Sequence, residues 1–90
     1  MPAAILKIYY TSHYLKAYER LPKRLQALQD KKECVFKNAP SHLSLKMHKL
    51  KGKYKQIYAY SIAYRWRVLF RFVNEREVIF YDIGTHGIYQ

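Results

Sequence analysis

The histidines of this chain are the side chains best suited to acid–base chemistry. His86 follows a glycine and a threonine near the last residues of the sequence, with Tyr89 three positions later, and His48 stands in the middle of the chain. An imidazole has an ordinary pKa near 6.5, so it can accept or donate a proton at neutral pH. We expect His86 and Tyr89 to remain within reach of a substrate, because little chain is left to bury them.

Basic side chains alternate along two stretches of the second half. Arg65, Arg67 and Arg71 share the parity of one expected strand, so they should point to the same side of it. The lysines at alternate positions ahead of the neighbouring strand are Lys49, Lys51, Lys53 and Lys55. A guanidinium binds two phosphate oxygens in a fixed fork, and an ammonium acts as a point charge. The pattern predicts a cationic sheet surface that can hold a phosphodiester.

The overall charge indicates a polyanionic or acidic partner. Seventeen Lys and Arg residues oppose six Asp and Glu residues, which gives a net charge of +11 and an isoelectric point near 9.9. No acidic residue lies between Glu33 and Glu75. Such a charge attracts nucleic acid or an acidic protein, and the alternative is a merely solvated basic face.

Several classes of function lack their sequence signals. Cys34 is the single cysteine and Asp82 is the only acid near the histidine motifs, so we expect neither a disulfide nor a metal site and no cofactor. A glycine-rich phosphate loop and a nucleophile elbow are absent too. No apolar run has the length of a membrane span, and the first residues lack the features of a signal peptide. We therefore expect a cytoplasmic protein without membrane contact.

The periodicity predicts one α+β domain spanning residues 1–90. A β-branched and aromatic run at 5–10 indicates a strand, and Thr11 and Ser12 can cap the helix that follows. Pro22 separates this helix from a second one, which ends near 38–41. Alternating stretches at 54–62, 64–73 and 77–83 indicate further strands. The expected fold is an antiparallel sheet of about four strands with two N-terminal helices packed on one face.

One strand predicts which face of the sheet the helices cover. Between residues 64 and 73, Trp66, Val68 and Phe70 share one parity and the arginines share the other. If the apolar side packs on the helices, the arginine side forms the open face. This parity also leaves simple core packing as an alternative to any binding role for Trp66.

Three stretches in the second half resemble a known family. HKLKGKYKQIYAY, YRWRVLFRF and VIFYDIGTHGIY resemble the RelE/ParE superfamily of toxins from bacterial type II toxin–antitoxin pairs, and most closely its YafQ-like mRNA interferases. The likeness extends to the order of elements, the length and the charge of most of the chain, and it is strongest over residues 48–89.

The resemblance implies both an activity and partners. Such toxins have an antiparallel sheet with N-terminal helices against it. They enter the ribosomal A site and cleave mRNA without a metal or cofactor, through attack of the ribose 2′-hydroxyl on the adjacent phosphate to leave a 2′,3′-cyclic phosphate. A cognate antitoxin, acidic and partly disordered, wraps and blocks the toxin. Operator DNA is bound only through the toxin–antitoxin complex.

The resemblance also implies catalytic residues. His48 stands at the position of a family histidine, His86 at that of the C-terminal histidine, and Tyr89 at that of a C-terminal aromatic residue. Arg67 falls where RelE has a phosphate-holding arginine. We expect His86 to act as general acid or base, with His48 as the second candidate, and Arg67 with Lys51 or Lys53 to stabilise the scissile phosphate. The alternative for His48 is a loop histidine bonded to backbone, and for His86 a frayed terminus.

The remaining basic and aromatic residues are expected to bind RNA. Trp66 matches a family tryptophan, and both it and Tyr89 can stack on splayed bases. The lysines and arginines expected to contact RNA are Lys49, Lys51, Lys53, Lys55, Arg65 and Arg71, and simple solvation is the alternative for the two arginines. His13 and His42 receive no role.

Two departures from the family leave the general base open. Ser61 replaces a further histidine of the YafQ-like set, and Arg65 replaces an aspartate beside the tryptophan. Because of these departures, two other functions remain alternatives. One is a ParE-like inhibitor that poisons DNA gyrase by binding, against which His86 argues. The other is an inactive, basic RNA-binding relative.

Overall fold

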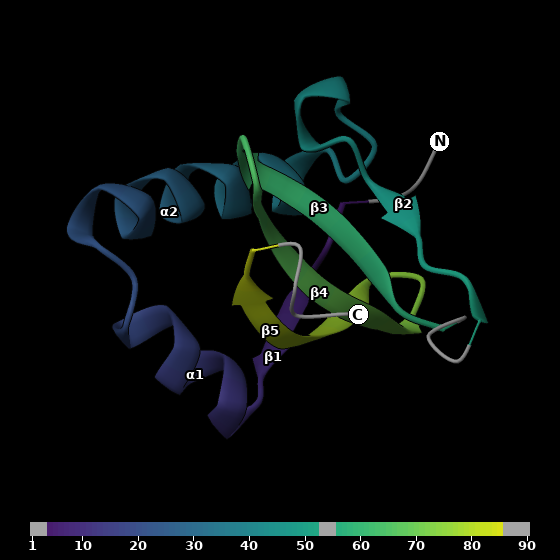
Figure 1. Ribbon diagram of the computed structural model, residues 1–90. Helices are drawn as coiled ribbons and strands as arrows, with labels where there is room; N and C mark the ends of the chain where they lie inside the picture. The colour runs from purple at the N-terminus through teal and green to yellow at the C-terminus, as the bar shows by residue number, and fades with distance from the viewer. Residues whose placement is uncertain (1–3, 53–55, 86–90) are drawn as a thin grey trace.

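The structure, a computed structural model, describes residues 4–52 and 56–85 and has an α+β fold. A five-stranded sheet carries two helices, α1 and α2, on one side (Figure 1). In chain order the elements are β1 (Lys7–Tyr10), α1 (Ser12–Glu19), α2 (Lys23–Asn38), the 3-10 turn η1 (Leu43–Leu45), β2 (His48–Lys49), β3 (Tyr58–Ala63), β4 (Trp66–Asn74) and β5 (Glu77–Gly84).

The sheet is mixed, whereas the sequence pattern predicted an antiparallel sheet of about four strands. The strand order is β1-β5-β4-β3-β2, and β2 to β5 pair antiparallel with their neighbours. β1 pairs parallel with β5, so that Ile8 lies opposite Val78. Parallel pairing requires a long connection, and nearly the whole chain separates these two strands. The short β2 escaped prediction because two residues carry no periodicity.

The core fills the space between the sheet and the helices. Val68, Phe70 and Phe80 project from the sheet and are fully buried against Phe36 of α2. The rings of Phe36 and Phe70 meet edge to face with centroids 4.8 Å apart. The predicted parity of β4 is therefore confirmed for Val68 and Phe70, and the arginine parity lies on the open face.

A buried hydrogen-bond network joins three elements inside this core. Gln29 of α2 has no exposed surface, and its Oε1 accepts from the Tyr60 hydroxyl of β3 at 2.9 Å. Its Nε2 donates to the Tyr14 hydroxyl of α1 at 3.0 Å. Burial raises the pKa of Tyr14 and of Tyr60 above the ordinary phenol value. Both phenols thus stay neutral and hold α1, α2 and β3 in one arrangement.

Hydrogen bonds join the start of α1 to β5. Thr11 is the N-cap, as the sequence predicted, and its Oγ1 accepts from the Tyr14 N–H at 3.0 Å. The Thr11 N–H donates to the Phe80 carbonyl at 3.1 Å, and its hydroxyl lies 3.2 Å from the carbonyls of Phe80 and Tyr81. These contacts fix the first turn of α1 beside the second half of β5.

A bulge in β5 sets the orientation of Asp82. Phe70 pairs with Phe80, but Leu69 pairs with Asp82, so Tyr81 is an extra residue on the β5 side. A bulge of this kind reverses which side chains face the core. Ile83 is consequently buried in the main core, and the carboxylate of Asp82 lies on the open face beside Leu69.

Candidate functional site

The open face of the sheet has a small apolar patch with polar residues around it. The patch consists of Ala59 and Leu69, with Leu50 packed against them, all buried. Ser61 and Arg67 lie opposite each other at the neighbouring step of the β3–β4 ladder. Arg71 lies on the same side of β4, two residues beyond Leu69, and is exposed. The predicted arginine surface is thus confirmed for Arg67 and Arg71.

Arg67 holds the β3–β4 turn through one end of its guanidinium. Its Nη1 lies 3.3 Å from Ser61 Oγ and 3.3 Å from the Ala63 carbonyl. The carbonyls of Tyr64 and Trp66 are both 3.1 Å away. Nη1 carries two hydrogens, so these four acceptors share them. Nε and Nη2 make no hydrogen bond to the described residues, and therefore remain able to donate to a phosphate.

The strand register relates Arg67 to the end of β5. Arg67 pairs with Gly84, the last residue of that strand. His86 and Tyr89, predicted as catalytic, lie outside the described residues, as do Lys53 and Lys55. The expectation that His86 and Arg67 act on the same phosphate therefore stays a prediction.

His48 is exposed and bonded to backbone. It lies opposite Ala59, which places it on the open-face side of β2. Its Nδ1 is 3.2 Å from the Lys46 carbonyl. This contact agrees with the alternative reading of His48 as a loop histidine, although the exposed ring leaves its other nitrogen accessible.

The remaining described basic residues do not form one surface. Lys49 lies opposite Tyr58, whose ring stacks on Phe70 at 5.7 Å, so Lys49 belongs to the helix side of the sheet. The expectation that it shares the face of Arg67 is therefore wrong, because the register of β2 turns His48 to that face instead. Lys51 and Arg65 are exposed, Arg65 in the β3–β4 turn.

Trp66 lies at the edge of the core and not on the open face. It is half-buried, packs against the main core and borders a cavity of about 460 Å³ between α1 and the ends of β4 and β5. We call this the α1 cavity. Its polar lining consists of His13, Lys16, Arg20 and Asp82. Trp66 therefore packs against the core with part of its ring and lines the α1 cavity with the rest.

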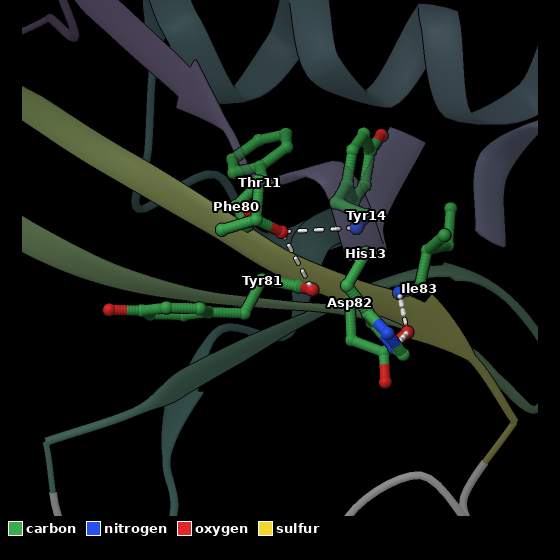
Figure 2. Close-up of polar contacts among 7 residues, drawn as sticks. All are labelled: Thr11, His13, Tyr14, Phe80, Tyr81, Asp82 and Ile83. Atoms are coloured by element: carbon green, nitrogen blue, oxygen red, sulfur yellow. Dashed lines mark hydrogen bonds and ion pairs between the residues drawn. The ribbon is translucent and has the colours of Figure 1, made fainter. Parts of the chain in front are cut away.

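A histidine–carboxylate pair stands at the border of this cavity. His13 Nε2 is 3.1 Å from Asp82 Oδ1, and the side chains are 71% and 20% exposed (Figure 2). The Ile83 N–H also donates to Asp82 Oδ1, at 2.8 Å. The pair borders a second cavity of about 400 Å³ on the open face, between Leu69 and Tyr81. His13 and Asp82 thus connect the α1 cavity with the open face.

The sequence pattern did not predict this pair: it indicated no role for His13 and a strand position near the motifs for Asp82. Only the parallel β1–β5 pairing and the bulge bring the two together, and neither has a local sequence signal. Within residues 4–52 and 56–85, no group of three or more His, Cys, Asp or Glu side chains could hold a metal ion. Nor is any helix of that part long and apolar enough to cross a membrane.

Comparison with known proteins identifies the fold. No protein-family model and no curated protein matches the chain. Among solved structures, the E. coli DinJ–YafQ toxin–antitoxin complex matches with 20% identity and a TM-score of 0.73, over 97% of this chain and 96% of that one. The YoeB/ParE toxin of Agrobacterium tumefaciens matches with 19% identity and a TM-score of 0.75, over 90% and 99%.

An archaeal complex has the same fold as these two structures. The RelE–RelB complex of Pyrococcus horikoshii OT3 matches with 17% identity and a TM-score of 0.70, over 98% of this chain and 99% of that one. The chain therefore has the fold of the RelE/ParE toxins, as the resemblance implied.

Proposed function

We propose that this protein is the toxin of a type II toxin–antitoxin pair and cleaves mRNA on the ribosome. The observation that carries the proposal is the RelE-like sheet with Arg67 on its open face. The guanidinium keeps two nitrogens for a phosphate, next to the strand end at Gly84 that leads to His86. The net charge of +11 suits an RNA substrate.

The reaction needs only groups of the chain and of the RNA. A base takes the proton of the 2′-hydroxyl, whose oxygen then bonds to the adjacent phosphorus. The bond from phosphorus to the 5′-oxygen breaks, and an acid protonates the leaving oxygen. Arg67 with Lys51 or Lys53 neutralises the charge that develops on the phosphate. His86 acts as general acid or base, with His48 as its alternative, and Tyr89 and Trp66 stack on bases. The products are a 2′,3′-cyclic phosphate and a 5′-hydroxyl.

The partners follow from the same proposal. The solved DinJ–YafQ and RelE–RelB complexes support an antitoxin for this chain, and its basic surface favours an acidic one. We infer that mRNA in the ribosomal A site is the substrate, that operator DNA is reached only through the toxin–antitoxin complex, and that the protein acts in the cytoplasm.

Mapping of mRNA ends tests the proposal most directly. The chain is expressed in a bacterium from a tightly regulated promoter, and the 5′ ends of ribosome-bound mRNA are sequenced. We expect cuts at a fixed position within codons, with cyclic phosphate ends. Intact mRNA with a DNA-damage response would support a gyrase inhibitor instead, and the absence of any growth defect would support an inactive RNA-binding relative.

His86→Ala is the first variant to compare. We expect it to fold and bind antitoxin normally while cleavage and toxicity fall by about 10²–10⁴-fold, which is the usual contribution of a general acid or base. His42→Ala, in the exposed turn before η1, is the matched control. Undiminished cleavage by the His86 variant would remove this residue from the mechanism.

A further inference from the structure

We propose that His13, oriented by Asp82, is the general base that takes the proton from the 2′-hydroxyl. The inference rests on the proposed endonuclease function and fills the role that Ser61 leaves open. His13 Nε2 faces Asp82 Oδ1 at 3.1 Å. It lies between the α1 cavity and the open face.

Backbone contacts fix the start of the helix that carries His13 and the carboxylate of Asp82. Thr11 caps α1 and bonds to the Phe80 carbonyl, so the first turn of α1 cannot slide along β5. The bulge at Tyr81 turns Asp82 to the same border, and the Ile83 N–H holds its carboxylate at 2.8 Å. Figure 2 shows the His13 ring against this carboxylate. Bulges are frequent beside active sites, where they redirect a side chain.

This arrangement suits a base. When the neutral imidazole donates its Nε2–H to Asp82, its Nδ1 carries the lone pair that accepts a proton. Within the described residues, Nδ1 makes no hydrogen bond, and the side chain is 71% exposed. The carboxylate stabilises the imidazolium as it forms and keeps the ring in one orientation.

The surroundings suit an RNA phosphate. Asp82 pairs with Leu69 and Gly84 pairs with Arg67, so Asp82 and Arg67 are diagonal neighbours on the open face, about 7–8 Å apart at their Cα atoms. Arg67 can hold a phosphate on this face, and the His13 imidazole borders the same face. The other charged groups that border the α1 cavity are Lys16 and Arg20 of α1, both cations, and Trp66 offers a ring for a base.

The step balances without an external reactant. The 2′-hydroxyl proton passes to His13 Nδ1, the 2′-oxygen bonds to phosphorus, and the bond to the 5′-oxygen breaks. The leaving oxygen receives a proton from the general acid, the role left to His86. His13 then releases its proton to water, which restores the neutral imidazole, and the general acid regains a proton from water.

Single-turnover cleavage on programmed ribosomes tests the assignment. We expect His13→Ala to slow cleavage by about 10²–10⁴-fold without weakening ribosome binding, and added imidazole to restore part of the rate, because the side chain is exposed. Asp82→Asn should slow cleavage to a smaller extent and alter the acid limb of the pH–rate profile. His42→Ala should behave as the unaltered protein does, and circular dichroism checks the fold of each variant.

A modified substrate separates the base from the acid. Replacement of the scissile 5′-oxygen by sulfur gives a leaving group that needs no proton. We expect this RNA to restore the rate of His86→Ala but not that of His13→Ala. Normal cleavage by His13→Ala, or rescue of that variant by the sulfur substrate, would overturn the assignment while the proposed function stands. Absence of cleavage by the unaltered protein would instead refute the proposed function.

Discussion

At the scale of single residues, Arg67 combines a structural and a chemical task. Its Nη1 lies 3.1 Å from each of the Tyr64 and Trp66 carbonyls, so it closes the turn between β3 and β4. The other nitrogens of the same fork are not engaged by the described residues. A guanidinium fixed at one end is preorganised at the other, and a preorganised donor loses little entropy when it binds a phosphate.

Substitution of Arg67 should therefore affect both stability and cleavage. We expect Arg67→Ala to lower the free energy of unfolding by about 1–3 kcal/mol, through loss of charge-assisted hydrogen bonds. The single-turnover rate should fall by about 10²–10³-fold, as for loss of one transition-state donor. Urea denaturation and ribosome assays measure the two effects.

Arg71→Ala and Arg67→Lys serve as comparisons. Arg71 is exposed on the same strand, so its loss should leave stability unchanged and weaken only RNA binding. Lysine keeps the charge at position 67 but not the fork, so it should restore little of the rate. Full activity of Arg67→Ala would mean that this guanidinium has only the structural task.

At the scale of elements, the Gln29 network decides how the helices sit on the sheet. Gln29 bonds to Tyr14 of α1 and to Tyr60 of β3, and these three side chains are buried. Buried polar groups are costly when unpaired and directional when paired. The network therefore selects one position of α1, and with it the position of His13 beside Asp82.

Disruption of this network should destabilise the fold. We expect Gln29→Leu to lower the free energy of unfolding by about 2–4 kcal/mol, because the Tyr14 and Tyr60 hydroxyls are left buried without a partner. The double variant Gln29→Leu/Tyr60→Phe should lose less free energy of unfolding than the sum of the losses in the two single variants. Urea denaturation measures all three variants, with Lys31→Ala on the exposed side of α2 as the control. Strict additivity would show that the three groups do not act as a unit.

At the scale of the whole molecule, tyrosine ionisation makes the free energy of unfolding depend on pH in the alkaline range. The Tyr18 hydroxyl donates to Asp30 at 2.7 Å, which raises the pKa of Tyr18 to about 12. An unfolded tyrosine loses its proton near pH 10, so between pH 10 and 12 the folded state binds more protons than the unfolded state. The free energy of unfolding should therefore fall as the pH rises through this interval.

Urea denaturation at pH 9 and at pH 11 tests this coupling. We expect the stability to be lower at pH 11 and the difference to shrink in Tyr18→Phe. Tyr64→Phe is the matched control, since Tyr64 is 89% exposed and makes no comparable contact through its hydroxyl with the described residues. An unchanged pH dependence in Tyr18→Phe would assign the effect to other groups.

The net charge of +11 should control association with ribosomes. We expect affinity to fall steeply with salt, because phosphate contacts release counterions. Arg71→Ala should reduce the slope of log K against log salt by about one, whereas Lys31→Ala on α2 should leave it unchanged. A salt-insensitive affinity would mean that the basic open face is not the ribosome-binding surface.

Local patterns were sufficient for much of the fold. The period-two stretch of β4 predicted which of its side chains face the core, because neighbouring side chains of a strand alternate. Thr11 and Pro22 marked the helix starts, since capping and the missing proline N–H act within a few residues. The cationic face followed from the same parity at Arg67 and Arg71.

Contacts distant in sequence decided the rest. The parallel pairing of β1 with β5, the register of β2 and the bulge at Tyr81 depend on strands that meet only in the folded chain. These three features turn Lys49 away from Arg67 and bring His13 to Asp82, 69 positions apart in the sequence. Residue types could thus supply the imidazole and the carboxylate, but only tertiary pairing, through hydrogen bonds that have no local signal, could place one against the other.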